Sequence, residues 1–265
     1  MPPFTCFSTI GCPEKSLPEV LSFADRHGIP FVEIRTLQMR EDLTVLFEKE
    51  YGDPERMEAL LARHRAHPLI WGSSYKLAGS DSLSGLESLI PWLKPCAWLR
   101  VMDGGKFGQT LTDKERKQCL RCLRRTNEQL AAAGLPTRVI IETHDVFARP
   151  DECRRMIDAA DGEFDLLWDS HHTWHMGGLS SEACWKLLGP WTRHIHVKDS
   201  HSGPAGFHYT LPGRGDFDFH ALFNTLKAGA YSGEVSLEWE KRWHPELPPI
   251  ETAFAAYDAM SADAQ

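Results

Sequence analysis

Short apolar runs rich in β-branched and aromatic residues alternate about eight times with helical patterns along this chain of 265 residues. Such regular alternation is typical of parallel sheets built from βαβ units. About 250 residues is the usual size of a barrel of eight such units, whereas an open doubly wound sheet more often has five or six strands. We therefore predict an α/β fold, a (β/α)8 TIM barrel, as one domain over residues 1–265.

The predicted elements take their bounds from the apolar runs and from helix start and stop signals. Pro18, Pro54 and Pro150 suit first turns of helices, whereas Gly28 and Gly134 suit helix ends. The strands are expected at 4–9, 31–35, 69–76, 98–102, 138–144, 165–169, 194–198 and 234–239, and the helices at 17–27, 54–67, 83–92, 112–133, 150–160, 181–188, 217–228 and 250–260. The stretch 36–53 is left as a long loop, which in a barrel belongs to the active site.

Composition excludes several classes of partner. The formal net charge is −8 and no basic run is present, so we expect no nucleic-acid partner. No apolar stretch is long enough to span a bilayer, and the first residues lack the pattern of a signal peptide, so we expect a cytoplasmic protein without a membrane partner. Seven scattered cysteines favour reduced thiols, and the pair Cys119 and Cys122 is interpreted as one turn of a helix, not a zinc site.

Four residues that can bind a metal lie at the ends of the last four predicted strands. Glu142, Asp169, His196 and Glu238 are separated by 27, 27 and 42 residues. The first two steps match a βαβ repeat, and the third allows for a long loop. Because the carboxyl ends of barrel strands converge on one mouth, we expect the four side chains to meet there.

A divalent cation would explain carboxylates at the ends of apolar strands, because an unpaired buried carboxylate is costly. Taken singly, each of the four could be an ordinary salt-bridged or hydrogen-bonded barrel residue. Three carboxylates with one imidazole suit Mn²⁺, Mg²⁺ or Co²⁺ better than a thiolate-preferring structural zinc. We predict one divalent metal ion, with Mn²⁺ first and Mg²⁺, Co²⁺ or Zn²⁺ as alternatives.

The motifs around these residues resemble the xylose isomerase-like barrels, a superfamily of sugar isomerases, epimerases, inosose dehydratases and divergent apurinic endonucleases. They are I-E-T-H at 141–144, W-D-S-H-H at 168–172, H-I-H-V-K-D at 194–199, P-G-R-G at 212–215 and V-S-L-E at 235–238. The resemblance covers essentially the whole chain and implies the same four metal ligands. It also implies that Glu142 and Glu238 are the catalytic acid–base pair and that His172 hydrogen-bonds the substrate.

Other polar residues near the expected mouth are candidates for substrate binding. Lys198 could polarise a substrate oxygen or form a structural ion pair, and Arg35, Arg100 and Arg214 could bind a substrate carboxylate or phosphate or form salt bridges. His194 is expected to be a hydrogen-bonded core residue. Further candidates are Glu33 and Lys76, and Trp71, Trp174, Trp239 and Trp243 as an apolar wall for a sugar. His171 and His175 are placed beside His172 in an irregular loop.

Four functions remain open at the level of sequence. The favoured one is a metal-dependent isomerase or epimerase acting on a keto-sugar or related polyol through a metal-stabilised enediolate, with a small carbohydrate as its partner. A dehydratase would use the same site on a ketocyclitol or keto-sugar. An apurinic-endonuclease-like phosphodiesterase is disfavoured because Lys76 and Arg100 stand where further zinc ligands are required. A binding barrel without turnover and a homo-oligomer also remain open.

Overall fold

The computed structural model describes residues 4–79, 83–161, 163–203 and 206–263. Eight parallel strands close into a barrel in the order β1-β10-β7-β6-β5-β4-β3-β2. They are β1 (Cys6–Ser8), β2 (Phe31–Ile34), β3 (His67–Lys76), β4 (Trp98–Met102), β5 (Arg138–Glu142), β6 (Leu166–Asp169), β7 (Thr192–Val197) and β10 (Glu234–Leu237). This closed barrel confirms the predicted fold class.

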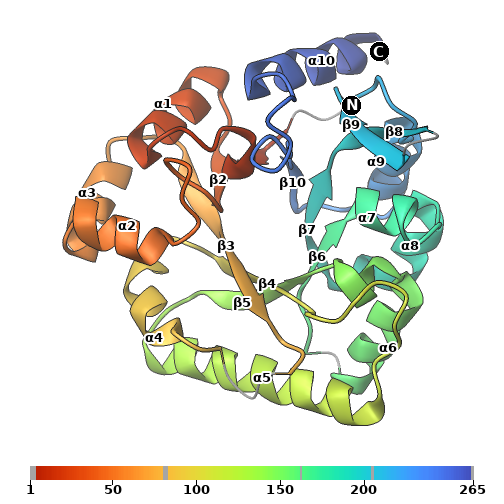
Figure 1. Cartoon of the computed structure of the whole chain (residues 1–265), viewed down its shortest axis with the longest axis horizontal. Coiled ribbons are helices and arrows are strands. Elements are labelled where there is room, and N and C mark those ends of the chain that lie inside the picture. The colour runs from red at the N-terminus through yellow and green to blue at the C-terminus, as the bar shows by residue number, and fades with distance from the viewer. Residues whose placement is uncertain (1–3, 80–82, 162, 204–205, 264–265) are drawn as a thin grey trace.

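Helices surround the barrel as an outer ring (Figure 1). They are α1 (Leu17–His27), α2 (Leu43–Glu50), α3 (Pro54–Leu61), α4 (Leu86–Leu89), α5 (Asp113–Ala132), α6 (Pro150–Ala159), α7 (Ser170–His175), α8 (Ser181–Leu188), α9 (Phe219–Ala228) and α10 (Ile250–Asp263). Local sequence sets several of their ends: Ser16 with Glu19 and Thr112 with Glu115 form capping boxes, and Gly28 ends α1 with a positive φ of 67°. No helix among the described residues combines the length and the apolar character needed to cross a membrane.

The period of two along each strand separates the outer core from the barrel interior. Ile195 and Val197 of β7 belong to the large core packed beneath the helices. Ile70, Ile140 and Leu167 form a separate small cluster. On β5 and β6, the residue two positions after Ile140 or Leu167 is a carboxylate, so the interior changes from apolar to acidic toward the carboxyl ends of the strands.

Three local expectations were wrong. The stretch 36–53 contains α2, which begins where the Asp42 carboxylate accepts a hydrogen bond from Val45 N at 3.4 Å. The supposed irregular loop with His171 and His175 is the short helix α7. After β7 the chain forms an unexpected antiparallel hairpin of β8 (Asp199–Gly203) and β9 (Gly206–Thr210). Cys119 and Cys122 are buried on α5, as the helical interpretation requires.

Candidate metal centre and active-site cavity

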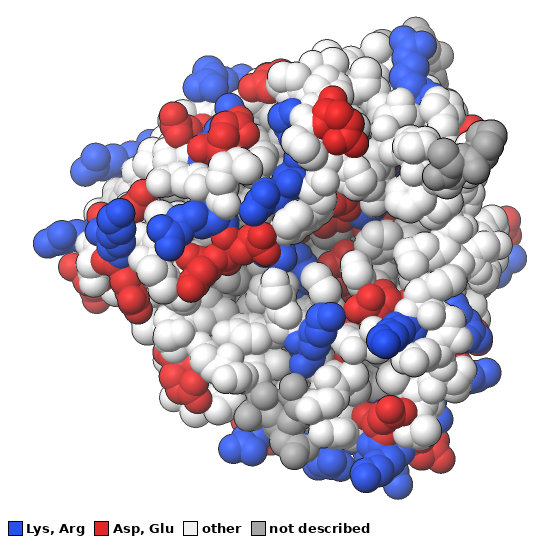
Figure 2. Space-filling model, in the orientation of Figure 1, with Lys and Arg blue, Asp and Glu red and all other residues white. Residues whose placement is uncertain are grey.

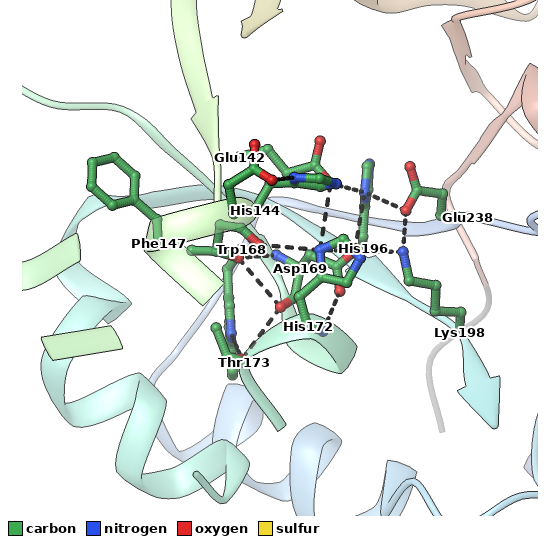
Figure 3. Close-up of polar contacts among 12 residues, drawn as sticks. Glu142, His144, Phe147, Trp168, Asp169, His172, Thr173, His196, Lys198 and Glu238 are labelled. Atoms are coloured by element: carbon green, nitrogen blue, oxygen red, sulfur yellow. Dashed lines mark hydrogen bonds and ion pairs between the residues drawn. The ribbon is translucent and has the colours of Figure 1, made fainter. Parts of the chain in front are cut away.

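The four predicted ligands converge at the carboxyl ends of adjacent strands. Glu142 ends β5, Asp169 ends β6, His196 lies in β7 and Glu238 follows β10. One potential ligand atom of each lies within 4.8 Å of those of the other three, and all four residues are buried. Figure 3 shows the Glu142, His196 and Glu238 side chains directed toward one another. The barrel therefore assembles the set that the sequence indicated.

The orientation of His196 fits a cation-binding site. Its Nε2 lies 2.8 Å from Glu33 Oε2, so Nε2 donates to Glu33 and the lone pair of Nδ1 is left for another partner. Nδ1 is buried without a hydrogen-bond partner among the described residues. It lies 3.2 Å from Glu238 Oε2, 3.7 Å from Glu142 Oε1 and 3.8 Å from Asp169 Oδ2.

Those separations suit atoms that share one ion. Ligands that each bind a cation at about 2.1 Å lie roughly 3 Å apart at right angles and about 4.2 Å apart on opposite sides of the ion. A buried ring nitrogen without a partner is unusual and requires a physical explanation. Three carboxylates and one imidazole are a donor set for Mn²⁺, Mg²⁺, Co²⁺ or Zn²⁺. The residues present thus fit a single divalent cation.

The charges around the cluster keep its carboxylates ionised. Burial alone would raise the pKa of Glu142, but the charge of Arg100 brings this pKa well below its usual value. Burial likewise opposes ionisation of Asp169, whereas His172 and Lys198 lower its pKa. Ionised carboxylates are the form that a divalent cation binds.

Lys198 directly follows β7, and its ammonium group is enclosed by carboxylates (Figure 3). Its Nζ lies 2.7 Å from Asp169 Oδ2 and 2.9 Å from Glu240 Oε1, and it also hydrogen-bonds Glu238. Burial would lower the pKa of Lys198, but these three carboxylates raise it, so the side chain remains charged. The structure shows the ion-pair role, and a contact between Lys198 and substrate stays a prediction.

A cavity of about 320 Å³ adjoins the cluster. Figure 2 shows acidic and basic side chains together around a hollow near the centre of the face in view. The cavity brings together His172 and Arg100, two of the predicted substrate-binding residues. Its described lining consists of Ile10, Arg35, Arg100, Met102, Glu142, His144, His172, Tyr209, Glu238, Glu240 and Trp243.

The two predicted substrate-binding residues in this wall are held by neighbouring polar groups. His172 Nδ1 lies 3.2 Å from the carbonyl oxygen of Thr143, and Arg100 Nε lies 3.3 Å from Glu142 Oε2. His144 lies beside His172 with ring centroids 5.0 Å apart. Burial opposes protonation of His144, but Asp145 and Glu142 raise its pKa to about 9.

Arg214 is the one predicted substrate-binding residue on the exposed surface, and it is not among the described residues that line the cavity. Its P-G-R-G motif instead surrounds the buried carboxylate of Asp199. This carboxylate accepts hydrogen bonds from the backbone N–H groups of Gly213 at 2.9 Å, Gly215 at 2.8 Å and Phe217 at 3.1 Å. A contact between Arg214 and substrate therefore stays a prediction without support from this geometry.

Sequence reasoning missed the role of Glu33 and the position of Tyr209. Glu33 Oε1 lies 2.9 Å from His194 Nε2, so one carboxylate holds both histidines of the H-x-H motif. This contact confirms the hydrogen-bonded core role of His194. Tyr209 reaches the cavity from the β8–β9 hairpin, whose alternating F-H-Y-T was the only local signal for a strand there.

Of the four tryptophans considered as a sugar-binding wall, Trp243 lines the cavity and is 44% exposed. Trp239 is buried, and its indole N–H donates to the carbonyl oxygen of Pro248 at 2.9 Å. Trp174 packs edge-on against Phe217. The structure therefore brings one of these aromatic residues to the site.

Comparison with known proteins identifies a family and a fold. The family model described as xylose isomerase-like TIM barrel matches residues 21–260. An inosose dehydratase of Klebsiella pneumoniae subsp. pneumoniae is 25% identical over an alignment of 185 residues that covers 61% of this chain. The chain spans 56% of the length of that curated relative.

Solved structures share the fold over nearly the whole chain. IolI protein with a bound zinc atom has a TM-score of 0.75 at 19% identity, covering 98% of this chain and 97% of that one. The 3-keto-D-glucoside 4-epimerase YcjR of E. coli has a TM-score of 0.71 at 17% identity, covering 98% and 99%. At these identities the likeness concerns the fold alone.

Proposed function

Because the chain belongs to the xylose isomerase-like TIM barrel family, we propose that it is a divalent-metal-dependent isomerase or epimerase of a keto-sugar or related polyol. One observation carries the proposal. The unpartnered Nδ1 of His196 faces the carboxylates of Glu142, Asp169 and Glu238 beside a cavity large enough for a small polyol. The IolI structure, which shares this fold, contains a bound zinc atom, and this supports the proposal that the chain binds a divalent metal.

Glu142, Asp169, His196 and Glu238 would hold the cation. When bound, a divalent cation polarises a carbonyl and a neighbouring hydroxyl of the substrate and makes the intervening C–H more acidic. Glu142 and Glu238 both line the cavity, and strands β6 and β7 separate their strands in the barrel. One carboxylate can therefore remove the proton while the other returns one from a different direction.

The remaining wall groups would orient the polyol. His172 and Glu240 line the cavity and can exchange hydrogen bonds with hydroxyl groups. Trp243 offers an apolar face to the C–H groups of a sugar. Lys198 hydrogen-bonds Glu238 and Asp169, which keeps both carboxylates ionised and in place.

The test is exchange of substrate hydrogen with solvent. Protein stripped of metal and reloaded with Mn²⁺ is incubated in D₂O with keto-sugars and ketocyclitols, and chelator is added before proton NMR. We expect loss of the signal from the C–H next to the carbonyl of one substrate, and no loss without metal. Glu142→Gln and Glu238→Gln should abolish exchange. Glu234→Gln is the matched control, because Glu234 lies at the amino end of β10 and is not among the described residues that line the cavity.

Protein that holds the metal and exchanges no substrate hydrogen would contradict this mechanism for the classes tested. A metal-free protein that remains inert after Mn²⁺ is added would favour a binding barrel.

A dehydratase is the second candidate, supported by the similarity to an inosose dehydratase over 61% of the chain. Removal of the same proton would then be followed by departure of a β-hydroxyl as water. The NMR experiment separates the two reactions by their products. An isomerase or epimerase returns a hydroxyketone with all its oxygens, whereas a dehydratase yields an unsaturated ketone that absorbs in the ultraviolet.

A further inference from the structure

Two arginines meet inside the mouth of the barrel, on the wall of the cavity. Arg35 follows β2 and Arg100 lies in β4, so they reach the site from either side of β3. Gly72 of β3 makes room for both. A Cβ on this glycine would lie 3.1 Å from Arg35 Cδ and 3.2 Å from Arg100 Nη2. The absence of a side chain at position 72 thus lets two guanidinium groups approach each other.

Their charges are not balanced by hydrogen-bonded carboxylates. Arg100 is 4% exposed, and its Nε and Nη1 are buried without a hydrogen-bond acceptor among the described residues. Arg35 Nη2 donates to the Ser74 hydroxyl at 2.9 Å, and Glu41 Oε2 lies 3.7 Å from it. Burial and then the charge of Arg100 lower the pKa of Arg35 to about 10. Glu142 lies close enough to Arg100 to form an ion pair, but buried guanidinium N–H groups are normally hydrogen-bonded, so this pair retains donors for a further anion.

We propose that Arg35 and Arg100 bind a carboxylate of the substrate, which makes the physiological substrate a polyhydroxy keto acid. This inference rests on the proposed function of the same cavity. A planar guanidinium matches a carboxylate with two parallel hydrogen bonds. Arg100 Nε lies 3.3 Å from Glu142, so the carboxylate would bind in the same cavity as the reacting carbons.

A carboxylate fits this cavity better than a phosphate. The wall also carries the carboxylates of Glu142, Glu238 and Glu240, which would repel a dianion more strongly than a monoanion. The volume of about 320 Å³ suits one six-carbon chain or ring. The structure therefore favours a compact monoanion over a larger phosphorylated sugar.

Three ligands that differ only at C6 test the proposal: D-fructose, D-fructuronate and D-fructose 6-phosphate. Their dissociation constants are measured by calorimetry on the Mn²⁺-loaded protein. We expect D-fructuronate to bind about 10- to 100-fold more tightly than D-fructose, as for a charged hydrogen-bonded pair. D-fructose 6-phosphate should bind more weakly than D-fructuronate.

Variants of Arg35 test whether the arginine pair causes the tighter binding of D-fructuronate. Arg35→Met should abolish the gain from the carboxylate, measured as the ratio of the dissociation constants of D-fructose and D-fructuronate within the variant. If circular dichroism shows that Arg35→Met does not fold, Arg35→Gln replaces it in the same comparison, because its amide keeps a hydrogen-bond donor toward Ser74. Arg242→Met is the matched control, because Arg242 pairs with Glu41 at 3.3 Å and is not among the described lining residues.

The proposal is overturned if the wild-type protein binds D-fructuronate no more tightly than D-fructose. It is overturned equally if neither ligand binds measurably. It is also overturned if the gain survives in the folded Arg35 variants, or if the phosphate binds best. The exchange experiment in D₂O is independent of this result. A preference for D-fructuronate without exchange of any ligand would retain the anion site and reject the proposed reaction.

Discussion

Glu33 determines which nitrogen of His196 faces the three carboxylates. It accepts from His196 at 2.8 Å and from His194 at 2.9 Å, and is itself buried. Burial opposes the ionised form, but His196 and His194 lower the pKa of Glu33 well below its usual value, so it remains a carboxylate. A carboxylate behind a ligating histidine fixes the ring and raises its basicity.

Glu33→Gln should therefore weaken Mn²⁺ binding about 10- to 100-fold, because an amide cannot accept from both histidines as a carboxylate does. The measurement is a Mn²⁺ titration followed by electron paramagnetic resonance. Glu48→Gln, on the exposed face of α2, is the control and should bind Mn²⁺ as the wild type does. Equal affinity in Glu33→Gln would show that the hydrogen bond does not position His196.

The buried carboxyl group of Asp103 makes the free energy of unfolding depend on pH. Its carboxylate accepts backbone hydrogen bonds from Gly105 at 2.8 Å, Val146 at 3.3 Å and Phe147 at 3.1 Å. Burial outweighs these donors and raises the pKa of Asp103 to about 6. The folded protein then binds this proton more tightly than the unfolded chain, so the contribution to stability is full below about pH 4 and is lost as the pH rises to about 6.

Asp103→Asn should remove this part of the pH profile, which corresponds to a change of up to about 3 kcal/mol in the free energy of unfolding. Urea unfolding at several pH values between about 4 and 7 measures it. Asp258→Asn, on an exposed position of α10, should retain the wild-type slope. An unchanged slope in Asp103→Asn would mean that the three backbone donors, and not burial, dominate.

The sequence predicted the neighbours of some site residues but not of others. Glu142, Asp169 and His196 were predicted as neighbours because each ends or nearly ends an apolar strand, and barrel geometry makes strand ends converge. The contact of Glu33 with His194 joins residues 161 positions apart. No local pattern encodes such a pairing, which exists only when the barrel closes. Lys198 was predicted as the last residue of its strand and directly follows β7, but its carboxylate partners come from two other segments, the end of β6 and the residues after β10.

At the scale of elements, the loop after the β8–β9 hairpin is organised by close backbone packing. A Cβ on Gly215 would lie 2.1 Å from Asp199 Oδ1 and 2.6 Å from the carbonyl oxygen of Ser200. Only glycine fits without displacing the carboxylate that holds the loop. The motif P-G-R-G therefore has a packing explanation in this chain, independent of any contact made by Arg214.

Gly215→Ala should lower the free energy of unfolding by about 1 to 3 kcal/mol, as expected for overpacking against backbone. Urea denaturation of the two proteins side by side measures the difference. Gly203→Ala is the matched control in the hairpin, because the nearest atom to its new Cβ would lie at 3.6 Å and a change within about 0.5 kcal/mol is expected. A loss of similar size at Gly203 would indicate a general sensitivity of the hairpin.

Elements with strong local signals were predicted and those without were not. The strand Trp98–Met102 and the helix Ser181–Leu188 were placed exactly, because both have clear hydrophobic patterns and end signals. The hairpin was missed because D-S-H-S-G lacks apolar alternation and its strands pair only with each other. Helix α2 was missed because it is short and lies within the long stretch after β2, where a barrel was expected to have a loop.

At the scale of the whole molecule, the four candidate ligands join half of the barrel. Their strands are consecutive in the order β10-β7-β6-β5, so a cation bound there would link four neighbouring strands. Closure of the barrel between β1 and β10 lies next to this set and depends on pairs such as Cys6 with Ser236. A cation that binds only the folded chain adds its binding free energy to the stability of the barrel.

Removal of metal by chelator should therefore lower the melting temperature, and Mn²⁺ should restore it. At a free concentration about 100 times the dissociation constant, the gain is about 2.7 kcal/mol, or roughly 5 to 10 °C for a domain of this size. In Asp169→Asn, which removes one ligand, the increment due to Mn²⁺ should fall to near zero, whereas Asp258→Asn should keep it. The quantity compared is the increment within each protein, so a general loss of stability in Asp169→Asn does not affect it. An undiminished increment in Asp169→Asn would mean that Mn²⁺ stabilises the barrel from a different position, and the four-residue cluster would then be an internal network of ion pairs.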